Sequence, residues 1–149
     1  IRRRRPREST GVDPRFTILI DGDCPLCRHE AALLRRLDRA RGRLALIDIA
    51  SAEFDPAPLG VSIQDLMGTI HGVLPDGRLI TGMEVFRQAY RAVGWGWLWA
   101  PTGWPLLRPA FDALYRWFAR RRLTLTGRRL VCEDGTCRLE PTRRRVRAA

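Results

Sequence analysis

Two cysteines separated by two residues, Cys24 and Cys27, lie between a strand-like run and a helix-like run, and no other feature of the sequence constrains the fold as strongly. The preceding residues 16–20 are β-branched, aromatic or leucine, which is typical of a strand. The leucines that follow recur at helical spacing. The pair therefore occupies a strand-to-helix junction, where this spacing indicates a redox-active dithiol.

The residues at this junction favour a reactive thiolate at Cys24. Pro25 has a fixed φ and no amide proton, so it suits the first helical position and makes Cys24 the N-cap. The Cys24 sulfur then faces the free N–H groups at the positive end of the helix dipole, which lowers the pKa of a thiol. Cys27, one turn later on the same side, is placed to attack a mixed disulfide. We therefore predict that Cys24 is the nucleophile and Cys27 the resolving thiol.

Two carboxylates adjoin the dithiol, Asp21 and Asp23. An ionised carboxylate raises the pKa of a neighbouring thiol, and it can also accept the proton of Cys27 during resolution. Alternatively, Asp21-Gly22-Asp23 only forms the turn, because Asp and Gly are favoured there. Both interpretations of each aspartate remain open at this point.

The apolar runs after the dithiol alternate in a pattern typical of an α/β fold. In chain order they predict a helix, a strand, a hairpin of two strands and a further helix, over residues 26–41, 44–49, 69–74, 78–81 and 83–93. The first helix should turn Leu33, Leu34 and Leu37 inward, and Gly42 should close it. The first strand, helix and second strand form a βαβ unit with parallel strands. We expect a central mixed sheet flanked by helices.

A Trp-rich segment follows residue 94. It contains Trp95, Trp97, Trp99 and Trp104 and continues as an amphipathic helix, whose apolar side comprises Leu106, Leu107, Phe111, Leu114, Tyr115 and Phe118. The uncharged stretch 92–107 is too short to cross a bilayer, which needs about 20 residues. The preferred interpretation is a helix that packs on the core and roofs the dithiol. Docking at a membrane surface or on a partner protein is the alternative.

The net charge of +11 is concentrated at the two ends of the chain. Residues 1–15 and 138–149 have too little apolar content to fold, so they are predicted to be a disordered basic arm and a disordered basic tail. Such segments bind polyanions weakly and in a salt-dependent way. No secretory signal is visible, which favours the cytoplasm. In that compartment a C-x-x-C pair is catalytic or metal-binding rather than structural.

A second cysteine pair, Cys132 and Cys137, flanks a short segment that contains Gly135. It could close a local disulfide, relay electrons to Cys24, or complete a metal site. Four cysteines in two pairs are compatible with zinc or an iron-sulfur cluster. His29 is predicted to be exposed, and His71 could assist proton transfer at the dithiol.

The motif Asp21-x-x-Cys24-x-x-Cys27, together with Asp76-Gly77 before Gly82, the Trp-rich segment and the run 115–122, resembles the DCC family of predicted, bacterial-type thiol-disulfide oxidoreductases. The resemblance covers residues 16–137. It implies a thioredoxin-like fold with the dithiol as active site and Asp21 as the leading acidic residue. Thioredoxin-like enzymes usually carry a cis-proline facing the dithiol, whereas residues 66–71 here have none and place Thr69 or His71 near that position.

Together these features predict a thioredoxin-like core over 16–94 and a helical extension over 95–137 that belongs to the same domain. The preferred function is thiol-disulfide exchange with a disulfide-containing protein or a small thiol, with no cofactor beyond the redox-active disulfide. One alternative is a zinc or iron-sulfur protein using Cys24, Cys27, Cys132 and Cys137. Another is a non-catalytic interaction module with an inert cysteine pair.

Overall fold

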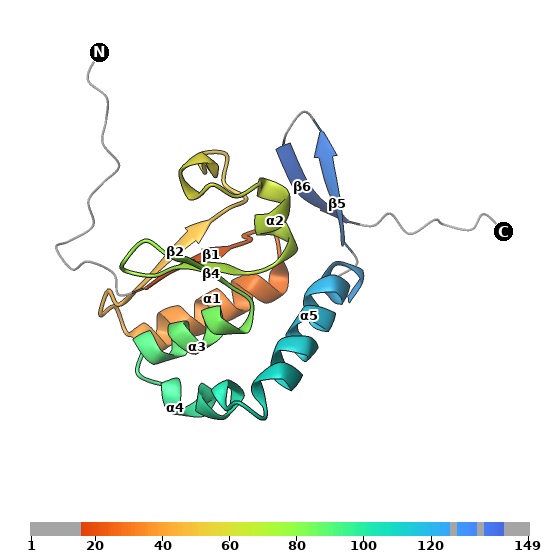
Figure 1. Cartoon of the computed structure of the whole chain (residues 1–149). Coiled ribbons are helices and arrows are strands. Elements are labelled where there is room, and N and C mark those ends of the chain that lie inside the picture. The colour runs from red at the N-terminus through yellow and green to blue at the C-terminus, as the bar shows by residue number, and fades with distance from the viewer. Residues whose placement is uncertain (1–15, 126–127, 134–135, 142–149) are drawn as a thin grey trace, which may run out of the picture.

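The run before the cysteines forms β1 (Phe16–Ile20), and α1 (Pro25–Asp38) returns the chain to β2 (Leu44–Asp48). β1 pairs with β2 in parallel along its whole length. The computed structural model describes residues 16–125, 128–133 and 136–141 (Figure 1). The predicted βαβ unit is thus confirmed, with the dithiol at the start of its helix.

The second half of the core is a hairpin followed by a helix. β3 (His71–Val73) and β4 (Leu79–Thr81) pair antiparallel, and α3 (Met83–Ala92) follows. Gly77 in the connecting turn has φ 84°, a left-handed conformation that favours glycine. β3 also pairs antiparallel with β1, so the strand order is β2-β1-β3-β4. This mixed four-stranded sheet flanked by helices is the predicted thioredoxin-like architecture.

Helices cover both faces of this sheet. Successive side chains of a strand point to opposite faces, and β1 follows that rule. Ile18 is buried in a cluster with Leu34 of α1 and side chains of α3, whereas Leu19 packs with Met67 of α2 (Ile63–Gly68) on the other face. A short 3-10 helix, η1 (Ala57–Leu59), precedes α2. The core therefore has three layers, with β1 at its centre.

The C-terminal extension begins with two short helices, α4 (Gly96–Trp99) and η2 (Ala100–Gly103), followed by the long helix α5 (Arg108–Leu125). The strands β5 (Arg128–Glu133) and β6 (Thr136–Pro141) then form a separate antiparallel hairpin. Figure 1 shows α5 running from α4 back toward the end of the molecule where α2 lies, and the hairpin contacts α2 there.

The tryptophans of the extension divide between core and surface. Trp99 stacks on Phe86 of α3, with ring centroids 5.7 Å apart, whereas the Trp97 side chain is 69% exposed. Leu106 is also exposed, because it precedes the first turn of α5. The predicted apolar side of α5 is therefore wrong at Leu106, Leu107 and Leu114, which are exposed, while Phe111, Tyr115 and Phe118 are half-buried.

Two further predicted boundaries are wrong. α1 ends at Asp38 rather than at residue 41, because Arg39 and Ala40 already adopt positive φ angles of 50° and 57° ahead of Gly42. The predicted tail begins too early, since residues 138–141 belong to β6. The predicted arm 1–15 and residues 142–149 lie outside the described residues. No helix among those described is both long and apolar enough to span a bilayer.

The side of α1 that faces the sheet also differs from the prediction at one leucine. Leu34 is 2% exposed within the core, but its neighbour Leu33 is 38% exposed. The buried positions of α1 are Ala31, Leu34 and Asp38, which follow each other at helical spacing. Leu33 lies outside that stripe.

This difference gives a matched test of the fold. We expect Leu34→Ala to lower the free energy of unfolding by about 2–5 kcal/mol, because it leaves a cavity between α1 and the sheet. Leu33→Ala, the same substitution one residue earlier, should cost less than about 1 kcal/mol. Urea denaturation of the two variants measures both values. Equal losses would contradict the placement of α1.

Candidate active site

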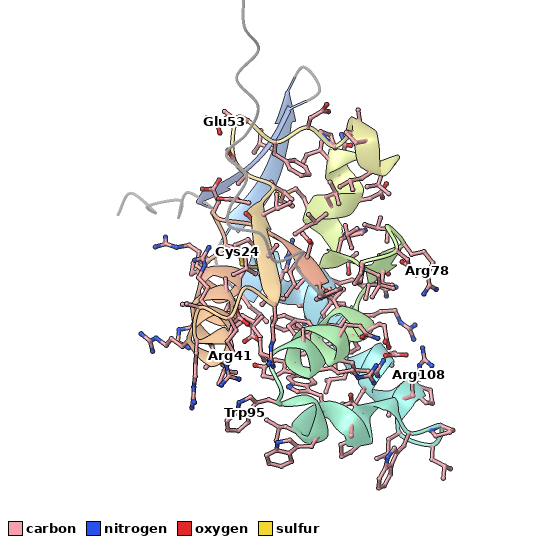
Figure 2. All side chains as sticks on the ribbon, turned by 90° about the vertical axis from the view of Figure 1, so that its left-hand side faces the viewer. Cys24, Arg41, Glu53, Arg78, Trp95 and Arg108 are labelled. Carbon is pink, nitrogen blue, oxygen red and sulfur yellow. The ribbon has the colours of Figure 1, made fainter. Side chains whose placement is uncertain are left out.

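Cys24 occupies the predicted N-cap of α1. Its backbone is extended, with φ −84° and ψ 118°, and Pro25 is the first helical residue. The Cys24 side chain is only 3% exposed, and Cys27 is half-buried. Figure 2 shows Cys24 among the elements of the core, whereas Arg78 and Arg108 lie at the edge of the molecule. The dithiol is therefore an internal site.

The turn before Cys24 is fixed by carboxylates. The Gly22 amide donates to Asp48 Oδ1 over 2.8 Å, and a Cβ atom on Gly22 would overlap the Asp48 carboxylate. The Asp23 amide donates to Asp21 Oδ1 over 3.1 Å. Asp21-Gly22-Asp23 thus forms the predicted turn, and Gly22 is needed there for a close approach. The contribution of Asp48, at the end of β2, was not predicted.

The two thiols have opposite acidities. A hydrogen bond from the Cys27 thiol, supported by the Cys27 amide and Arg122, lowers the pKa of Cys24 to about 6, although burial and Asp21 oppose this shift. The same hydrogen bond and burial raise the pKa of Cys27 well above its usual range. At neutral pH Cys24 is therefore largely a thiolate, and Cys27 holds the shared proton.

Arg122 is a site residue that the sequence analysis missed. It is buried near the end of α5, its Nη1 lies 3.8 Å from Cys27 Sγ, and its Nη2 donates to the Met67 carbonyl oxygen. The Arg122 charge lowers the pKa of both thiols and of Asp21. The run 115–122 was noted only as part of a family resemblance, and nothing in its spacing indicates that its last arginine reaches the dithiol.

Tyr115 attaches α5 to the core at a second point, through hydrogen bonds. The Tyr115 hydroxyl accepts a hydrogen bond from the Ile70 amide over 3.0 Å and lies 3.1 Å from Thr69 Oγ1. Tyr115 and Arg122 are seven residues apart, so they lie on the same side of α5 after two turns. Arg122 holds the end of α2, and Tyr115 holds the segment between α2 and β3, the place where thioredoxin-like enzymes carry the cis-proline. The helix that was predicted to cover the dithiol is α5.

Asp21 is a buried carboxyl beside the dithiol. Burial raises its pKa, although the Asp23 amide and Arg122 oppose the shift. Its Oδ2 atom is buried and has no hydrogen-bond partner among the described residues. Asp23, in contrast, is exposed. Of the two acidic residues that precede Cys24, only Asp21 is buried in the same interior environment as the thiols.

Both histidines can be placed. His29 is exposed, as predicted. His71 is buried in β3, its Nδ1 lies 3.0 Å from the Thr69 carbonyl oxygen, and burial lowers its pKa. His71 is not among the residues that line the cavity next to the dithiol. Its predicted part in proton transfer stays a prediction.

The second cysteine pair lies in the C-terminal hairpin. Cys132 of β5 is directly opposite Cys137 of β6 in the strand register. Their side chains lie outside the described residues, so the four-cysteine metal site stays a prediction. Within the part of the chain that the structure describes, no three His, Cys, Asp or Glu side chains are grouped as a metal ion would require.

A cavity of about 280 Å³ adjoins the dithiol. Cys24, Cys27, Asp21 and Arg122 all contribute to its lining, together with apolar side chains of β1, α1, α3 and α5. This arrangement combines a stabilised thiolate, a second thiol that can displace a sulfur bound to Cys24, a buried carboxyl and a fixed positive charge. A stabilised thiolate and a second thiol within its reach are the groups that thiol-disulfide exchange uses.

The role of Arg122 can be tested through the acidity of Cys24. We expect Arg122→Leu to move the midpoint of the pH profile for Cys24 alkylation upward from about 6. At pH 6 alkylation should be roughly three- to tenfold slower, because a positive charge next to the thiolate is lost. Peptide mass spectrometry after iodoacetamide treatment measures the rate at Cys24.

Two matched variants control this test. Arg120→Leu changes an exposed arginine of the same helix and should leave the profile unchanged. Arg122→Lys retains the charge and should lie between the parent and Arg122→Leu, which separates the electrostatic effect from the loss of the Met67 hydrogen bond. An unchanged midpoint in Arg122→Leu would contradict the role of the charge.

Comparison with known proteins agrees with this site. Residues 18–128 match the model of the DCC1-like thiol-disulfide oxidoreductase family. A protein of Arabidopsis thaliana described as uncharacterised and chloroplastic is 35% identical over 115 residues, which cover 76% of this chain and 54% of that protein. The chain thus spans about half the length of this relative, and no solved structure matches it. The chain belongs to the DCC1-like thiol-disulfide oxidoreductase family.

Proposed function

We propose that the chain exchanges disulfides through the Cys24–Cys27 dithiol, with Cys24 as nucleophile. The Cys24 thiolate attacks one sulfur of a substrate disulfide, the substrate S–S bond breaks, and the second substrate sulfur leaves as a thiolate. The observation that carries this proposal is the contrast between a Cys24 pKa of about 6 and a Cys27 pKa raised above its usual range. Of these two thiols, Cys24 is then the one that is ionised and reactive at neutral pH.

Resolution requires Cys27 to lose its proton. In the mixed disulfide Cys24 no longer carries a negative charge, so the interaction that chiefly raises the pKa of Cys27 is lost. Asp21 faces the same cavity, and its raised pKa makes it a stronger base than an exposed aspartate. We assign to Asp21 the acceptance of this proton. The Cys27 thiolate then attacks Cys24 Sγ, which releases the reduced substrate and leaves the Cys24–Cys27 disulfide.

Arg122 supports both steps of the exchange. Its fixed charge stabilises the Cys24 thiolate and, near Cys27, the thiolate that forms during resolution. Lowering the pKa of Cys24 also makes it a better leaving group when the protein disulfide is reduced again. The site therefore supports electron flow in either direction, and the redox partner determines which one operates.

The other predictions about partners remain predictions. Docking through the Trp-rich segment is compatible with the exposure of Trp97 and Leu106, but no contact among the described residues identifies a partner for this surface. The cytoplasmic location and weak polyanion binding by the basic ends also stay predictions. The zinc or iron-sulfur alternative is separated from the redox proposal by elemental analysis of protein purified without added metal.

Two cysteine variants test the proposed order of events. We expect Cys24→Ser to abolish formation of a dithiothreitol-reversible disulfide at Cys27, because no nucleophile remains. Cys27→Ser should instead stop at a stable mixed disulfide on Cys24 after treatment with 2-hydroxyethyl disulfide. Peptide mass spectrometry identifies the adduct and separates it from any change at Cys132 and Cys137. A Cys24 that reacts no faster than a free thiol at pH 7 would favour the interaction-module alternative.

Asp21→Asn should affect the stability of the fold and the rate of resolution in opposite ways. Because burial raises the pKa of Asp21, its contribution to folding is lost as the pH rises through that pKa, and the ionised carboxylate is unfavourable above it. We expect the neutral amide to raise the free energy of unfolding at pH 8 by about 1–2 kcal/mol, with little gain below pH 3.8. Urea denaturation of the reduced protein at both pH values measures this.

The same variant should slow resolution of the mixed disulfide, because the proton acceptor for Cys27 is removed. Asp23→Asn is the matched comparison, since Asp23 is exposed and its charge raises the pKa of Asp21 less than burial does. It should therefore change both quantities less than Asp21→Asn. Resolution can be followed by quenching with acid and counting the mixed and internal disulfides by mass. An Asp21→Asn protein that resolves at the parental rate would remove Asp21 from the mechanism.

A further inference from the structure

The nucleophile of this site is reached through a cavity rather than across an open surface. Cys24 is 3% exposed, yet it lines a cavity of about 280 Å³ together with Cys27. Most of the residues that line the cavity are apolar. They include Ile18 and Ile20 of β1, Leu34 of α1, Val85 and Phe86 of α3, and Phe118 of α5. A disulfide that meets Cys24 in this structure must therefore enter the cavity.

An extended peptide would meet backbone groups that are already hydrogen-bonded at this place. The Thr69 amide donates to the Asp65 carbonyl oxygen, and the Ile70 carbonyl oxygen accepts from the Gly82 amide. In the segment between α2 and β3, the Ile70 amide already donates to the Tyr115 hydroxyl. In the last turn of α2, the Met67 carbonyl oxygen already accepts from Arg122. Both partners belong to α5, which lies over the dithiol. β-Pairing of a substrate strand through the Ile70 amide would require the bond to the Tyr115 hydroxyl to break. The structure thus disfavours a folded protein or an extended peptide as the group that contacts Cys24.

The polar residues of the cavity define the charge that it accepts. Asp21 and Glu30 contribute carboxyl groups to the lining, and Arg122 already binds the Met67 carbonyl. An anionic ligand would meet these carboxyl groups and lose its hydration among apolar side chains, which is costly. An uncharged ligand with a hydrocarbon body gains instead from the removal of apolar surface from water.

We propose that the cavity binds a small, uncharged disulfide with an apolar body, of which an alkyl disulfide or a five-membered cyclic disulfide is the type. The volume of about 280 Å³ lies at the lower end of the roughly 300–1,000 Å³ typical of ligand pockets, which sets the size class. This proposal rests on the proposed function of Cys24 and names the substrate class of the same site.

The exchange balances without a further reactant. The Cys24 thiolate bonds to one substrate sulfur, the substrate S–S bond breaks, and the other substrate sulfur departs with the electron pair and takes a proton. Cys27 gives its proton to Asp21 and attacks Cys24 Sγ, which releases the first sulfur as a second thiol. The substrate disulfide is reduced by two electrons, and the dithiol is oxidised to the Cys24–Cys27 disulfide.

Methanethiosulfonates test this preference with a constant leaving group. The methyl, butyl and anionic 2-sulfonatoethyl reagents all transfer their S–R group to a thiolate and release methanesulfinate. The rate of loss of alkylatable Cys24 in the reduced full chain is divided by the rate of each reagent with N-acetylcysteine. Because each buried methylene contributes roughly a fourfold gain, we expect the butyl reagent to exceed the methyl reagent by about tenfold or more. The sulfonatoethyl reagent should fall below both.

Variants of the cavity wall locate the preference. Ala119→Leu narrows the cavity from α5 and should remove most of the butyl advantage, whereas Ala113→Leu changes an exposed residue of the same helix and should leave it intact. Phe118→Ala widens the same wall and should shift the preference toward a hexyl reagent. Because narrowing and widening predict opposite changes, a variant that folds poorly does not decide the result alone.

Three outcomes would count against the proposal. Equal normalised rates for the butyl and methyl reagents, a faster anionic reagent, or a butyl advantage that survives Ala119→Leu would each overturn it while leaving the proposed function intact. A Cys24 that reacts with none of the reagents faster than N-acetylcysteine would instead overturn the proposed function itself. The two failures are therefore distinguishable in one experiment.

Discussion

The hydrogen bond between the two thiols determines how this site can work, and the surrounding structure holds the two side chains in position to form it. Cys27 can donate to Cys24 only because Cys24 caps α1 and Cys27 follows one turn later. The cap in turn depends on the turn fixed by Asp21, Gly22 and Asp48. One shared proton thus gives two chemically identical residues opposite roles, and a buried environment keeps water from weakening the bond between them.

The sequence alone was sufficient wherever local rules govern the backbone. Pro25 and the apolar run before Cys24 determine the strand, the N-cap and the helix start, and all three were predicted correctly. Local rules were insufficient where the chain leaves a regular pattern. Arg39 adopts a left-handed conformation although it is not glycine, and Leu33 lies outside the buried stripe although it is apolar. Tertiary packing decides both positions.

The chemistry of the site was predictable in its first part only. The spacing of Cys24 and Cys27 indicates which thiol has the lower pKa, because the helix geometry places one of them at the positive end of the dipole, and the lowered pKa of Cys24 agrees. The role of Cys24 as nucleophile stays a proposal. The contribution of Arg122 depends on how α5 crosses the core, and no local pattern encodes that path. Asp21 was ambiguous for the same reason, since its burial, which separates it from Asp23, follows from the packing of the whole domain.

The late position of α5 in the chain has a consequence for synthesis. Arg122 follows Cys27 by 95 residues, whereas the sheet and the helices that form the core are complete by residue 92. The chain is synthesised from its N-terminus, at about 5–20 residues per second, and a domain folds as a unit. The dithiol is therefore made before the helix that covers it has emerged. During that interval the nascent chain presents the cysteine pair without α5 and without the Arg122 guanidinium, open to bulky disulfides that are too large for the cavity of the finished molecule.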